Sequence, residues 1–558
     1  MKLLKHLVLL ICLGVNMMHA HEHSEFESYK RGKCGHKHNL IPKLGISDEM
    51  PKSITEDPEK RKLRSQAHPF KVHVDTSNVK GVSREIKQYL EEVIAVQGNK
   101  IFAEKIGVTG YQTVASNRNI SRYCEYEHIV KVPEKYGSKN TNADFVLLLA
   151  TDDTGNDGTL AYATACYLER GTNRPIVGLA VFNPYYLDPG KGKLDNDVAT
   201  YVHEVLHALV FSSQLWKKFP KVDGESQYVI SHGQHYLRGK YLLRTVRQHF
   251  DCPSLKVVPL EDDGGEGSKG GHFERIVFGD ETMVSEDVAV AKFSKITLAL
   301  LKDSGWYQID LSRGDHYTWG KGEGCDIFKK TCGSTSVEET CSHNNNFGCD
   351  KTYSFKMSCQ RTAFTGRCNI KTKGTSCASG KERLQYFETQ GISSKCQEYF
   401  YNGQKKAACV KIRCNRSGTA YQAILKPKYE SQAPITFICT GENQTRQPQQ
   451  LGNSHTFICE NPKLICKNLC PKGCYNRGKC LDNGTCSCDF MFTGAICGKF
   501  KGCGNLDYEL CKKIVYSNKM NYKSYSNNFT SFDYDPDYNT YTSWSDLNRN
   551  LIATDSGL

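Results

Sequence analysis

The hydrophobic pattern changes along the chain and separates a region of regular elements from regions without them. Residues 70–74 alternate between apolar and polar with the period of two that is typical of a strand, and residues 143–149 end in the unbroken apolar run of a buried strand. Residues 83–106, between them, carry apolar side chains at helical spacing. We expect a mixed fold of the α+β class, with a sheet and helices.

Two later segments also have helical character. In residues 194–211 the apolar side chains recur three to four positions apart. A mixed segment and a glycine-rich loop at residues 264–271 follow, and residues 288–305 then form an apolar stretch that ends at a glycine. We expect a helix in each of the two apolar segments.

The first twenty residues have the pattern of a secretory signal peptide. Lys2 and Lys5 precede the apolar run at residues 7–15, and Ala20 offers a small residue for cleavage after residues 1–20. The run is too short to cross a bilayer, and no later segment has the roughly 20 apolar positions that a spanning helix needs. We expect a secreted, extracellular protein, free or held at the cell surface, without a transmembrane span in its mature chain. The alternative is an N-terminal anchor that is never cleaved.

Residues 21–68 are polar and charged and lack apolar periodicity. The basic stretch at residues 59–64 is typical of a linker that proteases can reach. This composition predicts a removable pro-segment, although an N-terminus without stable structure would have the same composition.

Cysteines change the interpretation of the second half of the chain. The sequence has 26 cysteines, and beyond Cys325 they recur at short intervals among strand-like and loop-like segments. We expect residues 326–465 to form a domain stapled by disulfides rather than by a large hydrophobic core, which requires an oxidising compartment. Because Cys12 falls in the signal peptide, an odd number remains, and Cys34 is left over when 24 are paired. Glycosylation sequons agree with the secretory route, at Asn119, Asn415, Asn443, Asn483 and Asn528.

Six cysteines within residues 466–500 resemble an EGF-like module. They follow the spacing C-x3-C-x5-C-x5-C-x-C-x8-C. The six are Cys470, Cys474, Cys480, Cys486, Cys488 and Cys497. Spacing alone would permit many connectivities, but the resemblance implies pairing of the first with the third, the second with the fourth and the fifth with the sixth. Residues 501–558 are rich in Tyr, Ser and Asn and are expected to form a flexible polar tail.

The net charge of +13 is concentrated in one block. Residues 351–428 contain 16 Lys and Arg against three Glu, so the rest of the chain is nearly neutral. Such a block can attract anionic cell-surface or matrix partners, or it can be a solvated face without a partner. It contains no recognisable nucleic-acid reading module, so we expect no nucleic-acid partner.

The candidate chemistry lies in the helix predicted at residues 194–211. His203 and His207 are the histidines of an H-E-x-x-H motif, and four positions apart on a helix they can both reach one metal ion. Glu204 is placed to take a proton from a water at the metal, so we expect it to be the general base. The motif predicts a single catalytic zinc ion, which needs three protein ligands and one open position.

The residues alone leave the third ligand open. The candidates are His232, His235, His249 and His272. His272 follows the glycine-rich loop, whose freedom at positive φ lets the backbone approach a metal closely. Met283 follows 11 residues later.

Five separate blocks of sequence resemble leishmanolysin, a family of surface metallopeptidases. The blocks lie at residues 161–166, 260–267, 271–275, 297–307 and 319–325, and the similarity runs from about residue 70 to residue 377. The resemblance implies a metzincin-type zinc peptidase domain, expected at residues 69–325, with a mixed sheet and helices. It implies that an insertion separates His207 from His272 as third ligand, and that Met283 forms a Met-turn beneath the zinc. Family membership also implies protein and peptide substrates and a role in cell adhesion.

The same resemblance gives Cys34 a function. Cys34-Gly35-His36 is similar to the setting in which a cysteine of the family caps the zinc in the precursor, although Lys37 stands where an acid is usual. A thiolate at the open position would keep the enzyme latent until the pro-segment is removed. Cys34 is therefore a candidate cysteine switch.

One residue departs from the family pattern. Metzincins carry a glycine three residues after the second histidine, where this chain has Val210. A β-branched residue is poor at positive φ, so either the helix runs on and turns later, or the site is distorted. We expect a secreted zinc metalloendopeptidase; the alternative is a catalytically impaired adhesion or binding protein on the same scaffold.

Overall fold

A computed structural model shows how these segments fold. It describes residues 44–46, 67–109, 120–137, 141–187, 189, 194–265, 268–288, 291–329, 340, 348–350, 353–366, 368–377, 387–391, 393–415, 418–467, 478–480, 486–488, 492–493, 497 and 499–500. Helices and sheets are mixed throughout these residues, so the predicted α+β class is confirmed. The predicted signal peptide, Cys34 and the predicted polar tail lie outside them.

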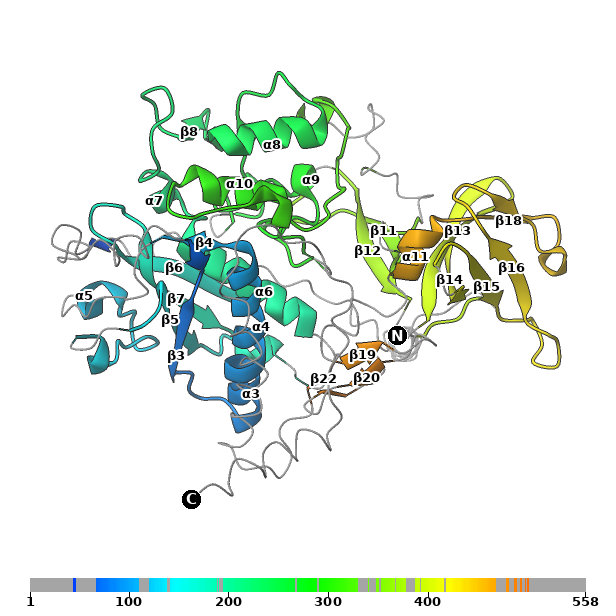
Figure 1. The fold of residues 1–558 in the computed structure, drawn as a ribbon, viewed down its shortest axis with the longest axis horizontal. Coiled ribbons are helices and arrows are strands. Elements are labelled where there is room, and N and C mark those ends of the chain that lie inside the picture. Colours follow the sequence, from blue (N-terminus) through cyan, green and yellow to red (C-terminus); the bar gives the residue numbers. More distant parts are fainter. Residues whose placement is uncertain are drawn as a thin grey trace, which may run out of the picture. The chain divides into compact units, whose positions relative to one another are not determined.

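A five-stranded sheet forms the centre of the first part of the chain, in the order β1-β6-β7-β5-β3 (Figure 1). Its strands are β1 (Gly45–Ile46), β3 (Val72–Asn78), β5 (Phe145–Thr151), β6 (Ala161–Leu168) and β7 (Pro175–Phe182). β3, β5 and β7 run parallel, β6 is antiparallel to β7, and β1 is parallel to β6. The strands predicted at residues 70–74 and 143–149 correspond to β3 and β5.

The inner strand β5 is buried on both faces, which explains its unbroken apolar run. Phe145, Leu147 and Leu149 point into the main core, which the helices cover, whereas Val146 and Leu148 belong to a second core on the opposite face. This alternation follows from the period of two of a strand. The second core includes α5 (Ile120–Cys124), which the disulfide Cys124–Cys166 ties to β6.

Two long helical segments pack on the side of the main core. The first consists of α3 (Arg84–Gln88), the π-helical η1 (Tyr89–Ile94) and α4 (Ala95–Lys105), which confirms the helix predicted at residues 83–106. The second is α6 (Leu194–Leu209). They meet where Gly98 faces Tyr201, since a Cβ on Gly98 would lie 2.2 Å from the tyrosine ring. Figure 1 shows α4 and α6 beside the sheet.

The segment after α6 builds a smaller helical and strand region. It contains α7 (Ser213–Trp216), β8 (Tyr228–Ser231), β9 (Gln234–Leu237), α8 (Lys240–Phe250), β10 (Val258–Pro259), α9 (Arg275–Phe278) and α10 (Lys295–Asp303). α10 is shorter than the helix predicted at residues 288–305: it begins at the N-cap Ser294, whose hydroxyl accepts from the Ile296 N–H. The disulfide Cys252–Cys325 closes the region.

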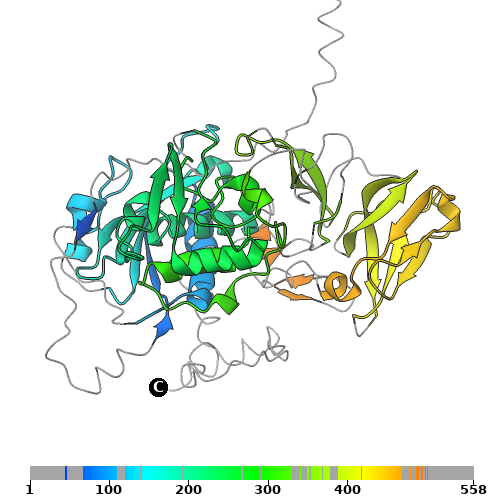
Figure 2. The same cartoon turned by 90° about the horizontal axis from the view of Figure 1, so that it is seen from above.

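The cysteine-rich part contains a six-stranded antiparallel sheet, in the order β16-β15-β14-β13-β18-β17. Figure 2 shows its yellow strands side by side. The strands are β13 (Ser394–Tyr401), β14 (Gln404–Cys414), β15 (Tyr421–Leu425), β16 (Ile435–Cys439), β17 (Thr445–Arg446) and β18 (His455–Ile458). The hairpin of β11 (Phe355–Gln360) and β12 (Ile370–Ser376) and the helix α11 (Pro462–Lys467) accompany them.

Both disulfides and a hydrophobic core hold this sheet together. The disulfides are Cys349–Cys396, Cys377–Cys409, Cys414–Cys466 and Cys439–Cys459. One face also buries a cluster that includes Val410, Ile412, Tyr421 and Phe457. The expectation of disulfides in place of a large hydrophobic core was therefore incomplete. Side chains alternate along β14 and β15, so every second one lies on the buried face and contributes to a core.

Short elements complete the described structure. They are β2 (His68–Pro69), β4 (Gly107–Val108), β19 (Gly478–Cys480), β20 (Cys486–Cys488), β21 (Phe492–Thr493), β22 (Lys499–Phe500) and the short helices η2 (Glu134–Gly137), η3 (Pro184–Tyr186), η5 (Leu311–Arg313), η6 (Asp326–Lys329) and η7 (Gln449–Leu451). A disulfide joins Cys488 and Cys497, the fifth and sixth cysteines of the EGF-like pattern; the side chains of the other four lie outside the described residues. Among the described helices, none is both long and apolar enough to span a bilayer.

Candidate metal centre

The helix α6 carries the H-E-x-x-H motif at its buried C-terminal end. Its apolar side chains belong to the main core, which holds the helix against the sheet. His203, Glu204 and His207 are all buried, with 5%, 1% and 0% of their surface exposed. Both histidine rings therefore sit in a site from which bulk water is excluded.

The third histidine comes from the glycine-rich loop, as predicted for His272. Backbone hydrogen bonds tie the ends of this loop together: Glu261 N–H donates to the His272 carbonyl at 2.9 Å, and Gly270 N–H donates to the Glu261 carbonyl at 2.7 Å. Gly270 has φ of +69°, and a Cβ there would lie 2.8 Å from the His235 ring, so only glycine suits this turn. The loop places a completely buried His272 opposite α6.

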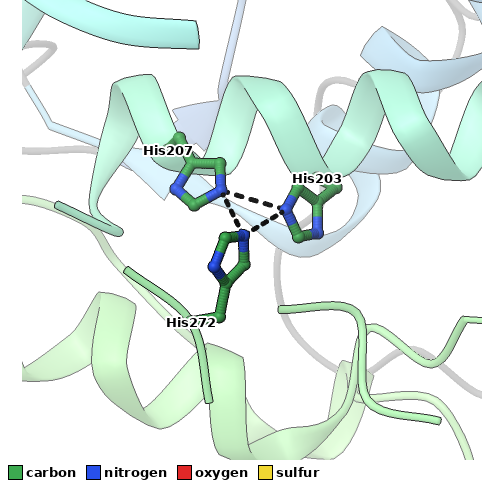
Figure 3. A group of neighbouring side chains, drawn as sticks. All are labelled: His203, His207 and His272. Carbon is green, nitrogen blue, oxygen red and sulfur yellow. Dashed lines mark hydrogen bonds between the residues drawn. The ribbon is translucent and has the colours of Figure 1, made fainter. Parts of the chain in front are cut away.

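Figure 3 shows the three imidazole rings pointing toward one another. The Nε2 atom of His207 lies 3.0 Å from Nε2 of His203 and 3.2 Å from Nε2 of His272, and the remaining pair is also 3.2 Å apart. Three ring nitrogens from two segments 65 residues apart thus converge on one point.

The other ring nitrogen of each histidine fixes its tautomer. Nδ1 lies 2.7 Å from the Thr282 carbonyl in His203, 2.8 Å from the Phe211 carbonyl in His207 and 3.1 Å from the Ser268 carbonyl in His272. A carbonyl only accepts, so each Nδ1 must carry the hydrogen. Each neutral ring then presents an Nε2 lone pair to the centre, and three lone pairs at this spacing repel one another unless a cation lies between them.

Burial favours the neutral form of His203. It lowers the pKa of this ring to about 4, and the hydrogen bond to the Thr282 carbonyl acts in the opposite direction. A proton is therefore a poor candidate for the shared cation at neutral pH.

The donor set fits zinc. Nitrogen ligands of zinc lie at about 2.0–2.1 Å, so two of them at a tetrahedral angle are about 3.3 Å apart. The observed Nε2 separations of 3.0 and 3.2 Å are close to that value. Three histidines with their outer nitrogens bound to carbonyls are the donor set of a catalytic zinc site, which leaves the fourth position open.

Met283 lies directly beside the site in a tight turn. Its side chain is completely buried, and its carbonyl accepts from the Phe273 N–H at 2.8 Å, next to His272. The preceding carbonyl, of Thr282, is the partner of His203. The turn therefore touches both segments that supply histidines.

A buried glutamate, which sequence reasoning missed, holds this turn. Glu281 accepts from the Met283 N–H at 2.6 Å, from the Thr297 hydroxyl at 2.6 Å and from the Ser294 hydroxyl at 3.0 Å. Burial raises the pKa of Glu281 to about 7, against the effect of these hydrogen bonds. Only the acidic residue immediately before Thr282-Met283 could have signalled this role.

A second missed glutamate holds the glycine-rich loop. Glu261 is completely buried and accepts from the Asp263 N–H, the Arg275 N–H and the Ser285 hydroxyl, at 3.0, 3.2 and 2.7 Å. Burial raises the pKa of this carboxyl as well. Residues before and after His272 are thus joined through one side chain.

Val210 does not distort the site. It is completely buried and is absent from the residues with positive φ; its N–H still donates to the Leu206 carbonyl at 2.9 Å, in the manner of a helix. The Phe211 N–H donates to the same carbonyl, and the Tyr307 hydroxyl donates to the Leu209 carbonyl at 3.1 Å. The helix ends at Leu209 and the chain turns at Val210, so the turn comes at the usual glycine position but without a positive φ.

The remaining candidate histidines lie elsewhere. His235 pairs with the Tyr228 hydroxyl, and His249 Nε2 lies 2.7 Å from the Trp319 carbonyl. His232 is exposed in the turn between β8 and β9. Within the described residues, none of the three is grouped with His203 and His207.

Comparisons with known proteins agree with this site. A family model described as leishmanolysin matches residues 82–426. The leishmanolysin-like peptidase of Drosophila melanogaster is 32% identical over 232 residues, which cover 34% of each chain. Leishmanolysin of Leishmania major is 28% identical over 216 residues, covering 38% of this chain and 34% of its own. The leishmanolysin homolog of Crithidia fasciculata is 24% identical over 439 residues, covering 75% and 62%.

The alignments with the fly and Leishmania proteins span only about a third of the length of those relatives. The family model, in contrast, covers well over half of the 558 residues and includes all three histidines of the site. The chain therefore belongs to the leishmanolysin family.

Proposed function

We propose that this protein is a secreted, zinc-dependent metalloendopeptidase. The observation that carries the proposal is the convergence of three Nε2 atoms, each aimed by a hydrogen bond from Nδ1 to a main-chain carbonyl. The leishmanolysin family is a family of zinc metallopeptidases, and this arrangement supports the same cofactor here.

His203, His207 and His272 would hold the ion, and Met283 would form the floor beneath them. Zinc held there supplies a Lewis acid, which polarises a carbonyl and lowers the pKa of water from about 15.7 towards 7. Exclusion of bulk water strengthens each of these electrostatic effects.

Glu204 is the proton carrier in this proposal. It follows His203 directly on α6 and is buried in the same site. Its carboxylate takes a proton from the attacking water and then delivers it to the leaving amine, so one group acts as base and then as acid. The substrates would be extended segments of proteins.

The assay is cleavage of casein or gelatin by protein freed of its N-terminal segment, with and without a chelator and with zinc content measured in parallel. We expect chelator-sensitive cleavage by the unaltered protein. Glu204→Gln should retain one zinc per chain and lose cleavage, because it keeps the shape of the side chain but cannot accept the proton.

His235→Ala is the matched control, since His235 lies near the loop but outside the triad; it should retain both zinc and cleavage. Zinc binding without cleavage by the unaltered protein would overturn the enzymatic proposal. The protein would then be the catalytically impaired binding protein of the alternative hypothesis, for which the basic block at residues 351–428 would be the first surface to test.

A further inference from the structure

Residues 44–46 belong to the segment expected to be removed as a pro-segment, yet Gly45 and Ile46 form a strand of the main sheet. β1 pairs in parallel with β6, with Gly45 opposite Tyr167 and Ile46 opposite Leu168. In the part of the chain that the structure describes, β1 is the last strand on this side. Without it, the outer backbone groups of β6 would form an open sheet edge, which is a template for a further strand.

The residue before this strand packs on an apolar cluster. Leu44, itself partly buried, packs against the cluster of Ala165 and Leu168 of β6 and Leu215 of α7, as does Trp306. Ala165, Leu168 and Leu215 are buried to within 1% of their surface. The cluster therefore offers an apolar surface for one large side chain beside the strand edge.

Gly45 lies in a slot that excludes any side chain. A Cβ on Gly45 would lie 2.4 Å from the Tyr167 ring and 2.5 Å from the Tyr123 ring, both closer than van der Waals contact. The disulfide Cys124–Cys166 holds α5 against β6 immediately beside these two rings, so the slot cannot widen easily. The requirement for glycine comes from this close approach and not from backbone conformation.

Ile46 adds little to recognition, because 44% of its surface is exposed. The sequence preference of this surface is thus an apolar residue followed by glycine. We call the surface the β6 seat and define it by Tyr123, Ala165, Tyr167, Leu168, Leu215 and Trp306.

The β6 seat adjoins α6, the helix that carries His203 and His207. A Cβ on Gly178 of β7 would lie 3.0 Å from the Ala208 Cβ and 2.9 Å from the Thr164 carbonyl, so α6 crosses the sheet next to His207 at this point. Gly178 pairs with Ala165, which also contacts Leu44. The short helix α7, which carries Leu215, begins four residues after α6 ends.

We propose that the β6 seat is a docking site for an extended apolar-Gly segment and that residues 44–46 of this chain are its occupant. The docked segment stays on the peptidase domain after the chain is cut in the following residues, so that cutting and release are separate steps. Because ten residues of extended chain span up to about 35 Å, this anchor also keeps Cys34 within about 35 Å of the seat. Docking itself requires neither the metal nor the thiol.

The test uses the full chain with the recognition sequence of a site-specific protease inserted after Asp57. The chain is cut, passed through size-exclusion chromatography, and analysed for the N-terminal fragment by mass spectrometry. We expect the fragment to co-elute with the rest of the protein, with or without a chelator. An excess of a synthetic peptide of residues 40–50 should displace it.

Two variants remove the docking contacts, and a third variant is a matched control. Gly45→Val should release the fragment because its side chain cannot enter the space beside the two tyrosine rings, and Leu44→Asn should release it because the cluster on which Leu44 packs is apolar. Ile46→Thr changes a neighbouring, exposed residue and should retain the fragment. In the uncut chain, hydrogen exchange of residues 165–169 should be slow for the unaltered protein and Ile46→Thr, and faster for the other two.

Three results would overturn the proposal. Loss of the fragment from the unaltered protein on cutting would show that nothing anchors it. Retention by Gly45→Val and Leu44→Asn would place the anchor elsewhere. Release of the unaltered fragment by the chelator alone would mean that the metal and Cys34, and not the seat, hold the segment. None of these results depends on whether the protein cleaves a substrate.

Discussion

The metal centre and the C-terminal sheet are fixed in position by different means. The loop of His272 and the turn of Met283 are each organised by one buried glutamate, Glu261 and Glu281, which accept several hydrogen bonds. The six-stranded C-terminal sheet is crossed by disulfides, four of which lie within the described residues. Hydrogen-bonded carboxylates respond to pH and to the metal, whereas disulfides respond to reductant, so the two regions can be perturbed separately.

The largest expected effect is on the metal. His272→Ala removes one of three converging nitrogens, so we expect loss of bound zinc and loss of cleavage to background. Zinc per chain, measured after dialysis, checks this, with His249→Ala as the control because its ring binds the Trp319 carbonyl instead. Unchanged zinc content in His272→Ala would remove His272 from the ligand set.

The next largest effect is on the stability of the C-terminal sheet. Cys439 and Cys459 close a loop of 20 residues, so replacing both by serine should lower the free energy of unfolding of the C-terminal sheet by about 3 kcal/mol. Zinc content should not change. Urea unfolding of the double variant, followed alongside zinc release, separates the two regions; simultaneous loss of zinc would show that they are not independent.

A smaller effect is the pH dependence of stability that Glu281 causes. Burial raises the pKa of Glu281 from 4.5 to about 7, so the folded chain binds this proton more tightly than the unfolded chain does. The contribution of this group to stability is therefore greatest below about pH 4.5 and falls as the pH rises towards 7.

Glu281→Gln should abolish this fall and, at pH 7, lower the free energy of unfolding by about 2 kcal/mol, because the amide nitrogen replaces one of the two oxygens and would face either the Met283 donor or the Thr297 donor. Urea unfolding at a series of pH values checks both effects. An unchanged pH dependence would show that Glu281 does not titrate in this range.

The smallest effect is at Val210. Because its side chain is completely buried and its backbone needs no positive φ, Val210→Gly should not improve the enzyme. We expect a loss of about 1.5 kcal/mol in the free energy of unfolding from the buried methyl groups, with zinc content unchanged. Thermal unfolding checks the loss of stability, and the casein assay checks the activity. An increase in both would contradict the backbone geometry described for Val210.

The sequence predicted α6 and its two histidines better than the loops around them. The reason is the number of residues that separates the groups of the site along the chain. His203 and His207 are four residues apart, so helical periodicity alone brings them together. His272 required the family resemblance, because the residues alone left four candidates open. Glu261 and Glu281 lie in loops without periodicity, where a buried acceptor looks like any surface acid. β1 is only two residues long and lies in a polar segment, so no hydrophobic pattern predicted it.

The outer ring nitrogen of each of the three histidines lies against a main-chain oxygen, the carbonyl of Thr282, Phe211 or Ser268. In many metal sites a carboxylate side chain has this task, and a single substitution removes it. Here a substitution at any of the three positions leaves the accepting oxygen in the polypeptide. Point mutations at these positions therefore leave the hydrogen bonds that orient the ligands in place. Changes that move the backbone, such as insertions in the loops, would disrupt them.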